Sequence, residues 1–350
     1  MNAPIHTSWS RPSVVLLVAV ATLATAFAFQ QPAGPARSAQ YTARCRNVPA
    51  CPWPAEPPSS ATNLTAVEGP GTNDFHEDLS GAYWNPAQQA LWLCRNGGSG
   101  GSKIWKLVSS GPSTFQVATV AGQRAEWTGF GDCEAITLAT LAEPSTLFTI
   151  EEGSNSIQEW DLSLPSAVLR RTWNLSAFVP AYAGGLGLEA LTFVPDAALV
   201  AGGFVGANGQ PRVSTQGMGS LAFVGHQNGG RIYVFDLNRA TGAFQFVGAY
   251  RTSDPETAEL FFDPSLGVLF AWHGDGRNDL EVLELGSTVV GSERQLDRRL
   301  TYDFPGTENV EGFALQWSPA GCPGTRGAFV TTDDGGAIAL RWFRQFPCGF

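Results

Sequence analysis

The chain has 350 residues, including 40 Gly and 23 Pro, and an apolar content close to the average for globular proteins. This composition is typical of a turn-rich all-β domain and argues against a disordered chain or a helical array. The net charge is −10 and the only lysines are Lys103 and Lys106. Nucleic-acid binding is therefore not expected, because it needs basic surface to neutralise phosphates.

The N-terminal residues 1–28 have the pattern of a secretory signal. Arg11 supplies a positive charge, residues 13–29 are apolar, and Ala26-Phe27-Ala28 places small residues at the usual cleavage positions. The alternative is an uncleaved anchor helix, but this run of 17 residues is slightly short for a membrane span. We therefore expect a secreted or periplasmic protein that has no membrane span after cleavage.

Residues 29–60 contain Pro, Ala, Ser and Arg in mixed order without periodicity, which predicts a linker or a loosely ordered N-terminal segment. A single domain over residues 61–350 is expected to follow it. Six cysteines, an even number, agree with an oxidising compartment but allow fifteen pairings. The pairing that we consider is Cys45–Cys51, Cys322–Cys348 and, by remainder, Cys94–Cys133.

One short motif recurs five times after residue 60: an acidic or hydroxyl residue, usually followed by Gly or Ala, at the start of an apolar strand. Successive copies are separated by 54, 55, 70 and 52 positions. A period of this length, with several short strands in each unit, indicates a β-propeller rather than a solenoid. The first residues of the motifs, called anchors here, are Ser80, Glu134, Glu189, Glu259 and Glu311.

Each repeat is expected to contain an anchor strand, a second and a third apolar strand, and an outer strand that is clearest at residues 115–121 and 244–250. The Gly-rich residues 202–219 read as an insertion that accounts for the longest interval. The last repeat ends after three strands, so residues 64–69 are expected to supply its outer strand. We therefore predict a five-bladed β-propeller; a six-bladed one is the alternative and would need a further motif in the long interval.

The anchors begin the innermost strands, so they should surround one mouth of the central channel. The second strand of each repeat runs antiparallel to the first, and its end returns to the same mouth. Asp132 lies two residues before the second anchor. The polar residues at the ends of the second strands are Asn96, Glu152, His226, His273 and Asp333.

Four carboxylates directed at one axis cannot all be ionised without either raised pKa values or a bound cation. Oxygen ligands in an irregular ring suit Ca²⁺ best, and Mg²⁺ or Mn²⁺ less well. The alternative is that the glutamates hydrogen bond to backbone amides of neighbouring blades. The predicted metal ligands are Ser80, Glu134, Glu152, Glu189, Glu259, Glu311 and Asp333. His226 and His273 are candidate general bases, although packing is the commoner role of such a histidine.

At these motifs the chain resembles the SdiA-regulated family of bacterial exported propellers and, more loosely, the phytase-like esterase family. The segments that carry the resemblance are Asp78-Leu79-Ser80-Gly81, Asp132-Cys133-Glu134-Ala135, Gly187-Leu188-Glu189-Ala190, Asn309-Val310-Glu311-Gly312 and Ile150-Glu151-Glu152. The resemblance implies a five-bladed propeller with a metal-linked site in the channel. The fourth motif departs from it, because Leu260 follows Glu259 where a small residue is usual.

These observations predict a monomeric calcium-binding propeller that takes a small-molecule or cell-surface ligand at the channel mouth. One hypothesis is a metal-dependent hydrolase of phosphate or carboxylic esters, in which the metal polarises the ester and activates water. The other is a non-catalytic binding module in which the calcium is structural. A fold of this kind hosts both, so the fold alone does not decide between them.

Overall fold

The computed structural model describes residues 50–69, 74–76, 78–97, 101–274, 277–322, 324–333 and 338–349. The expected signal peptide, Cys45 and residues 29–49 of the expected linker lie outside the described residues. Among the described residues, no helix has the length and apolar character needed to cross a membrane.

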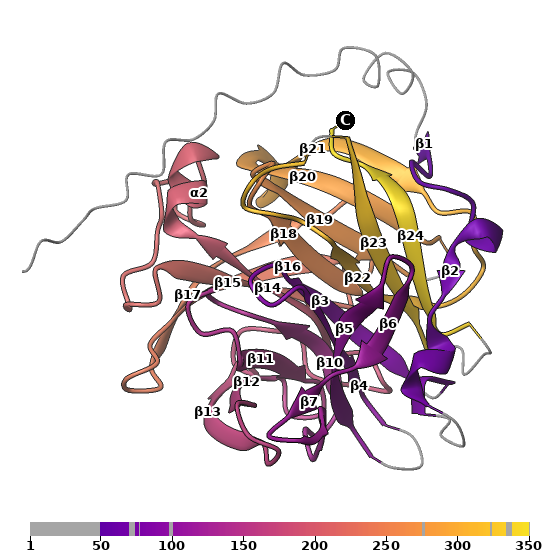
Figure 1. The fold of residues 1–350 in the computed structure, drawn as a ribbon. Coiled ribbons are helices and arrows are strands. Elements are labelled where there is room, and N and C mark those ends of the chain that lie inside the picture. The colour runs from indigo at the N-terminus through magenta and orange to yellow at the C-terminus, as the bar shows by residue number, and fades with distance from the viewer. Residues whose placement is uncertain are drawn as a thin grey trace, which may run out of the picture. The chain divides into compact units, whose positions relative to one another are not determined.

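The fold consists of four-stranded antiparallel meanders that follow one another along the chain (Figure 1). The first meander contains β3 (Leu79–Asn85), β4 (Ala90–Arg95), β5 (Lys103–Gly111) and β6 (Thr114–Val117); the second contains β10 (Cys133–Thr137), β11 (Thr146–Glu151), β12 (Ser156–Asp161) and β13 (Val168–Asn174). The third contains β14 (Leu188–Pro195), β15 (Ser220–His226), β16 (Arg231–Leu237) and β17 (Phe244–Arg251); the fourth contains β18 (Glu259–Asp263), β19 (Val268–His273), β20 (Asp279–Val290) and β21 (Glu293–Asp303). The last contains β22 (Val310–Leu315), β23 (Thr325–Thr332), β24 (Leu340–Pro347) and β2 (Thr62–Asn63).

The first strands of the meanders form a closed ring. Strand β3 contacts β10, β10 contacts β14, β14 contacts β18, β18 contacts β22, and β22 returns to β3. Such a ring around one axis is the arrangement of a β-propeller. The expectations of an all-β chain and of a propeller arrangement are therefore confirmed.

The ring is closed by residues from the N-terminal side of the domain. Strand β2 pairs antiparallel with β24, with Thr62 opposite Trp342 and Asn63 opposite Arg341. The expectation that residues 64–69 form this strand is wrong, because the 3₁₀ helix η2 occupies Thr65–Glu68. The hydroxyl of Thr65 accepts hydrogen bonds from the amides of Ala339 and Leu340, so this turn also holds the last meander.

The segment just before β2 is part of the packed domain. Strand β1 (Cys51–Pro52) pairs with β21. Trp53 is buried, and its ring makes edge-on contacts with Trp272 and Phe304. The expectation of a loosely ordered segment therefore has to be corrected for residues 50–60. A segment without hydrophobic periodicity can still be packed against the domain, because a single tryptophan buries a large apolar surface.

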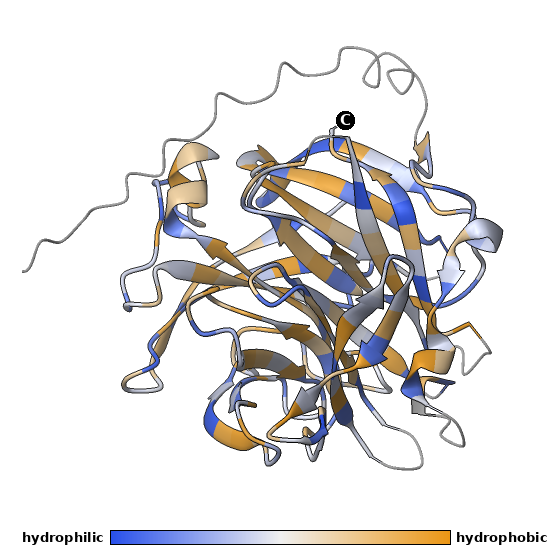
Figure 2. Cartoon of the chain, viewed as in Figure 1, coloured by the Kyte–Doolittle hydropathy of each residue, from blue (hydrophilic) through white to orange (hydrophobic). Residues whose placement is uncertain are grey.

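Most of the strongly hydrophobic residues lie in the strands, where hydrophilic residues interrupt them (Figure 2). The insertion at residues 202–219 follows the short helix α2 (Asp196–Ala201) and precedes β15. Asp236 on β16 fixes the insertion by accepting hydrogen bonds from the amide and hydroxyl of Thr215, each 2.7 Å long.

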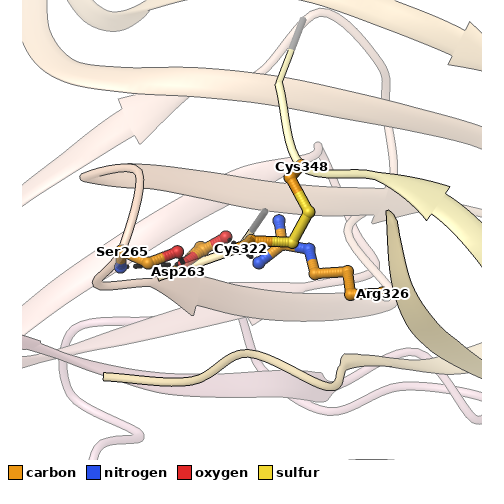
Figure 3. The surroundings of a disulfide bond; sticks show 5 residues. All are labelled: Asp263, Ser265, Cys322, Arg326 and Cys348. Atoms are coloured by element: carbon orange, nitrogen blue, oxygen red, sulfur yellow. Dashed lines mark hydrogen bonds and ion pairs between the residues drawn. A yellow bond between two sulfur atoms is a disulfide. The ribbon is translucent and has the colours of Figure 1, made fainter. Parts of the chain in front are cut away.

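The disulfide between Cys322 and Cys348 is present (Figure 3), as expected. Beside it, Arg326 on β23 forms a buried ion pair of 2.5 Å with Asp263 on β18. Cys51 is disulfide-bonded, and its partner lies outside the described residues. The considered Cys94–Cys133 bond is wrong: both are buried free thiols, and the Cys94 thiol donates to the Cys133 carbonyl oxygen at 3.3 Å.

Candidate metal centre

Four of the five inner strands carry a β-bulge at the anchor. In β10, the three steps from Cys133 to Ile136 are matched by only two steps on β11. Strands β14, β22 and β3 show the same single extra residue. A bulge bends the strand and turns a side chain away from its normal alternation. The bulges therefore account for the direction of the anchor side chains toward a shared site.

The small residue after the anchor allows neighbouring inner strands to approach closely. A Cβ atom on Gly81 would lie 2.7 Å from the Cα of Ala135, and one on Gly312 would lie 2.3 Å from the carbonyl oxygen of Ser80. Both distances are shorter than real Cβ contacts allow. The recurring small residue in the motif is thus a requirement of ring packing.

The carboxylates of three anchors meet, and we call this group the inner triad. It consists of Glu134, Glu189 and Glu311, whose ligand oxygens all lie within 4.8 Å of one another. All three side chains are buried, with residue exposures of 3%, 3% and 6%. They come from β10, β14 and β22, so the sequence-distant repeats do converge on one place.

A second group, which we call the outer triad, shares one residue with the first. It consists of Asp132, Glu134 and Glu152, again with ligand oxygens within 4.8 Å of one another. Glu152 is 4% exposed, and Asp132 is partly exposed. Asp132 precedes β10, and Glu152 follows β11.

Several predicted or neighbouring polar residues surround the two triads. Asn96 donates a hydrogen bond of 2.8 Å to Oε1 of Glu134, and the side chain of Ser80 also hydrogen bonds to Glu134. Asn309 donates to Oε1 of Glu311 at 2.6 Å and to Oδ2 of Asp333 at 3.4 Å. The structure therefore places Ser80, Asn96 and Asp333 beside the triads.

Asn309 was not among the residues expected at the site. It stands two positions before its anchor, as Asp132 and Asp78 do before theirs. The polar residue two positions before the anchor could therefore have been used to predict Asn309 as a residue of the site.

The triads are electrostatically crowded. Burial, followed by the charge of neighbouring carboxylates such as Glu152, raises the pKa of Glu134 to about 8. Burial likewise raises the pKa of Glu152 to about 7, and it raises those of Glu189 and Glu311 well above the usual range. Two unit charges 4.8 Å apart interact by about 3.5 kcal/mol at an effective dielectric constant near 20, so a fully ionised cluster needs compensation.

Compensating positive charge from the protein is absent among the described residues: no ion pair joins Lys or Arg to either triad. Three buried oxygens at the site have no hydrogen-bond partner, namely Oε2 of Glu134, Oε1 of Glu152 and Oδ1 of Asn96. Buried polar atoms are normally satisfied, and an unsatisfied one indicates a missing partner such as an ion.

The donor set fits a hard divalent cation. Calcium–oxygen bonds of 2.3–2.6 Å place ligands on opposite sides of the ion about 5 Å apart, close to the 4.8 Å span of each triad. All of these donors are carboxylate oxygens, which favour Ca²⁺, Mg²⁺ or Mn²⁺ over metals that prefer thiolate or imidazole.

Glu259 lies in neither triad. Its strand has no bulge at the anchor, because Glu259 and Leu260 are paired in regular register with Trp272 and Ala271. Its carboxylate accepts hydrogen bonds from the amides of Leu260 at 2.8 Å and of Ala82 on β3 at 3.4 Å. Glu259 thus hydrogen bonds to backbone amides, which was the alternative to metal binding. In the sequence, this copy of the motif differs from the others by Leu260 in place of a small residue.

The two candidate histidines also lie outside both triads. Nδ1 of His226 accepts a hydrogen bond of 2.9 Å from the amide of Asn228, and Nε2 lies 3.4 Å from the carbonyl oxygen of Pro180. Burial lowers the pKa of His226, which keeps it neutral at pH 7. Both ring nitrogens are therefore engaged by the backbone.

His273 forms a buried ion pair in which Nε2 lies 3.0 Å from Oε2 of Glu281. Its Nδ1 faces the carbonyl oxygen of Glu256. Burial alone would lower the pKa of His273, but the hydrogen bond and charge of Glu281 outweigh it, so the pKa is raised. Oxygen atoms of Glu281 and Glu256 thus hold the ring of His273 on both sides.

The loop between β13 and β14 forms an exposed rim beside the acidic cluster. Tyr182 and Leu186 are 41% and 47% exposed, and Gly184 and Gly185 form the turn between them with φ of +66° and +82°. The charge of Glu152 foremost, and also that of Asp132, raises the pKa of the Tyr182 phenol. An aromatic side chain close enough to feel the charge of these carboxylates was not anticipated from the sequence.

No model of a known protein family matches the chain, and no curated protein matches it. Among solved structures, the chain is similar to a chain in "Crystal Structure of Mitotic Checkpoint Complex", with 16% sequence identity and a TM-score of 0.36. The match covers 76% of this chain and 63% of that chain. The propeller arrangement described above depends on the strand pairing and not on this likeness.

Proposed function

We propose that this protein is an exported five-bladed β-propeller that binds Ca²⁺ at the acidic mouth of its channel, and that it is related to the SdiA-regulated family. The blade number is supported by the five anchors in the sequence and by the ring of β3, β10, β14, β18 and β22. Export is supported by the pattern of residues 1–28 and by the Cys322–Cys348 disulfide.

The observation that carries the proposal is the combination of clustered carboxylates with unpartnered oxygens. Glu134, Glu189 and Glu311 would hold the ion, and Asn96 and Asn309 would orient two of these ligands through their hydrogen bonds. Metal-free, the same cluster is stable only with several carboxyls protonated, as their raised pKa values indicate.

The activity that we propose for this site is hydrolysis of a phosphate or carboxylic ester by a monomeric enzyme. A bound divalent cation polarises an ester oxygen and lowers the pKa of a water molecule. The chain's own contribution would be to hold the acidic ligands in a buried site and to contact the ligand at the rim through Tyr182. His226 and His273 are not assigned a proton-transfer role, because their ring nitrogens are engaged elsewhere.

The second candidate is a binding module in which the cation is structural. The engagement of both histidines favours it, and so does the exposed pair Tyr182 and Leu186, which suits contact with a small-molecule or cell-surface ligand. The two candidate functions differ in whether the calcium-bound protein hydrolyses an ester.

The test is calcium content of the purified protein, followed by hydrolysis of p-nitrophenyl phosphate and p-nitrophenyl acetate with Ca²⁺ or EDTA. Glu189→Gln is the test variant and Glu259→Gln the matched control, because Glu259 is equally buried but lies outside both triads. Calcium-dependent turnover lost only in Glu189→Gln supports the hydrolase. Bound calcium without turnover supports the binding module, and a protein that binds no divalent cation overturns both.

A further inference from the structure

We infer that the channel mouth holds a pair of divalent cations, one in the inner triad and one in the outer triad, with the carboxylate of Glu134 between them. The inference rests on the proposed cation binding and adds the number of ions and the role of each ligand. Glu134 is the only residue that belongs to both triads, which makes it the bridging ligand.

The geometry separates two binding positions. The five carboxylates Asp132, Glu134, Glu152, Glu189 and Glu311 form two groups with a 4.8 Å span, and they do not form one group of that span. An ion that binds oxygens at about 2.4 Å cannot contact ligands much more than 5 Å apart. A single ion in the inner triad therefore leaves Asp132 unbound, whereas two ions use every carboxylate.

The charge balance also favours two ions. Five ionised carboxylates carry a charge of −5, so one divalent cation would leave −3 and two would leave −1. No Lys or Arg among the described residues forms an ion pair with any of the five. Charges that are buried without partners are strongly disfavoured, so with a single ion the remaining carboxyls would have to stay protonated, whereas two ions allow all five to act as ligands.

The unpartnered oxygens point to the outer position independently of the inner one. Oε1 of Glu152 is buried and has no hydrogen-bond partner, and Glu152 belongs only to the outer triad. Oε2 of Glu134, the shared residue, is also unpartnered, while its Oε1 is occupied by Asn96. The outer position thus has an unpartnered ligand oxygen of its own, and the Glu152 carboxylate also hydrogen bonds to Glu189, which links the outer triad to the inner one.

The two positions differ in exposure, which predicts an order of binding. Glu189 and Glu311 are 3% and 6% exposed, and Asp132 is only partly buried. The inner ion is therefore expected to bind more tightly and to exchange more slowly than the outer one. Carboxylate-bridged two-metal sites have ions about 3.5–4 Å apart, so two Mn²⁺ ions at this mouth should be magnetically coupled.

The experiment is equilibrium binding of Ca²⁺ and of Mn²⁺ to the full-length mature protein after EDTA treatment, with electron paramagnetic resonance of the Mn²⁺ form. We expect two ions per chain and a coupled Mn²⁺ spectrum. In Asp132→Asn we expect one ion to remain bound, at least ten times more tightly than any second ion. The Mn²⁺ form of this variant should give the spectrum of an isolated Mn²⁺ ion. Glu311→Gln should weaken the inner ion at least tenfold, and Glu259→Gln should retain both ions.

The outcomes separate this inference from the proposed function. One ion per wild-type chain, with an uncoupled Mn²⁺ spectrum, overturns the pair while the cation-binding proposal stands. Two ions that persist at unchanged affinity in Asp132→Asn also overturn it, because the second ion would then lie elsewhere. Binding of no ion overturns both proposals. The wild-type stoichiometry and spectrum need no variant, so a variant that fails to fold does not prevent the test.

Discussion

Replacing Glu189 by Gln should remove the stabilisation by calcium while changing the metal-free protein little. Glu189 is a buried member of the inner triad. Its pKa is raised well above the usual range by burial first and then by the charges of Glu134 and Glu311. Burial and these charges therefore favour the protonated form of Glu189 in EDTA, and glutamine has nearly the same shape as the protonated side chain. We expect a change of less than about 1 kcal/mol in the free energy of unfolding in EDTA.

The effect of Glu189→Gln on the stabilisation by calcium is expected to be much larger. A ligand present at one hundred times its Kd stabilises the folded state by about 2.7 kcal/mol. Loss of one carboxylate from the inner triad should weaken binding by roughly 100-fold, since even indirect changes at metal sites cost 10- to 100-fold. At the same Ca²⁺ concentration the gain then falls to about 0.4 kcal/mol. For a domain of about 290 residues the lost stabilisation corresponds to roughly 4 °C in Tm.

The assay is thermal and urea unfolding followed by tryptophan fluorescence, which the eleven Trp residues make sensitive to tertiary structure. Wild type, Glu189→Gln and Glu259→Gln are compared in EDTA and in Ca²⁺. Glu259→Gln should keep the full calcium shift, because its carboxylate binds backbone amides and not the cluster. An equal calcium shift in wild type and Glu189→Gln would refute the reasoning. If Glu189→Gln is instead much less stable than wild type in EDTA, Glu189 stabilises the packing of the blades without metal.

The remaining predictions concern pH, ring packing and the domain boundary. The pKa values of Glu134 and Glu152 in the folded protein, about 8 and 7, exceed the ordinary value of 4.5. The metal-free folded state thus binds more protons than the unfolded chain between pH 4.5 and 8, and this contribution to stability is present below pH 4.5 and lost as the pH rises through 7 to 8. It amounts to at most about 5 kcal/mol for Glu134, and urea unfolding in EDTA at pH 5 and pH 8 measures it; unfolding free energy that rises over this interval contradicts the assignment. Gly312→Ala should destabilise the fold by about 1–3 kcal/mol and weaken Ca²⁺ binding, because its Cβ would lie 2.2 Å from Oγ1 of Thr331 and 2.3 Å from the carbonyl oxygen of Ser80; Gly321→Ala, at an open turn with φ of +88°, is the control for calcium affinity and should leave it unchanged. Trp53→Ala should cost about 3–5 kcal/mol in thermal or urea unfolding, and a change below 1 kcal/mol would return residues 50–60 to the linker.

Local patterns in the sequence determined the repeat. The alternation of short apolar strands with Gly, Asn and Pro turns depends on neighbouring residues, so it can be found without knowing the tertiary structure. The grouping of Glu134, Glu189 and Glu311 could be predicted from the repeat, because equivalent strands of a propeller surround the same axis. The small residue after four of the five anchors reflects the close approach of inner strands. Leu260 stands in the copy whose strand lacks the bulge.

Only the tertiary structure decided how individual side chains are used. Glu259 has the same residue type and nearly the same context as the other anchors, but its strand lacks the bulge and its carboxylate turns to backbone amides. His226 and His273 end second strands as expected, yet partners distant in the sequence, such as Pro180, engage their rings. Trp53 is buried by aromatic rings from other meanders. Strand order is encoded by periodic local patterns, whereas the partner of a polar or aromatic side chain depends on chain segments that meet only after folding.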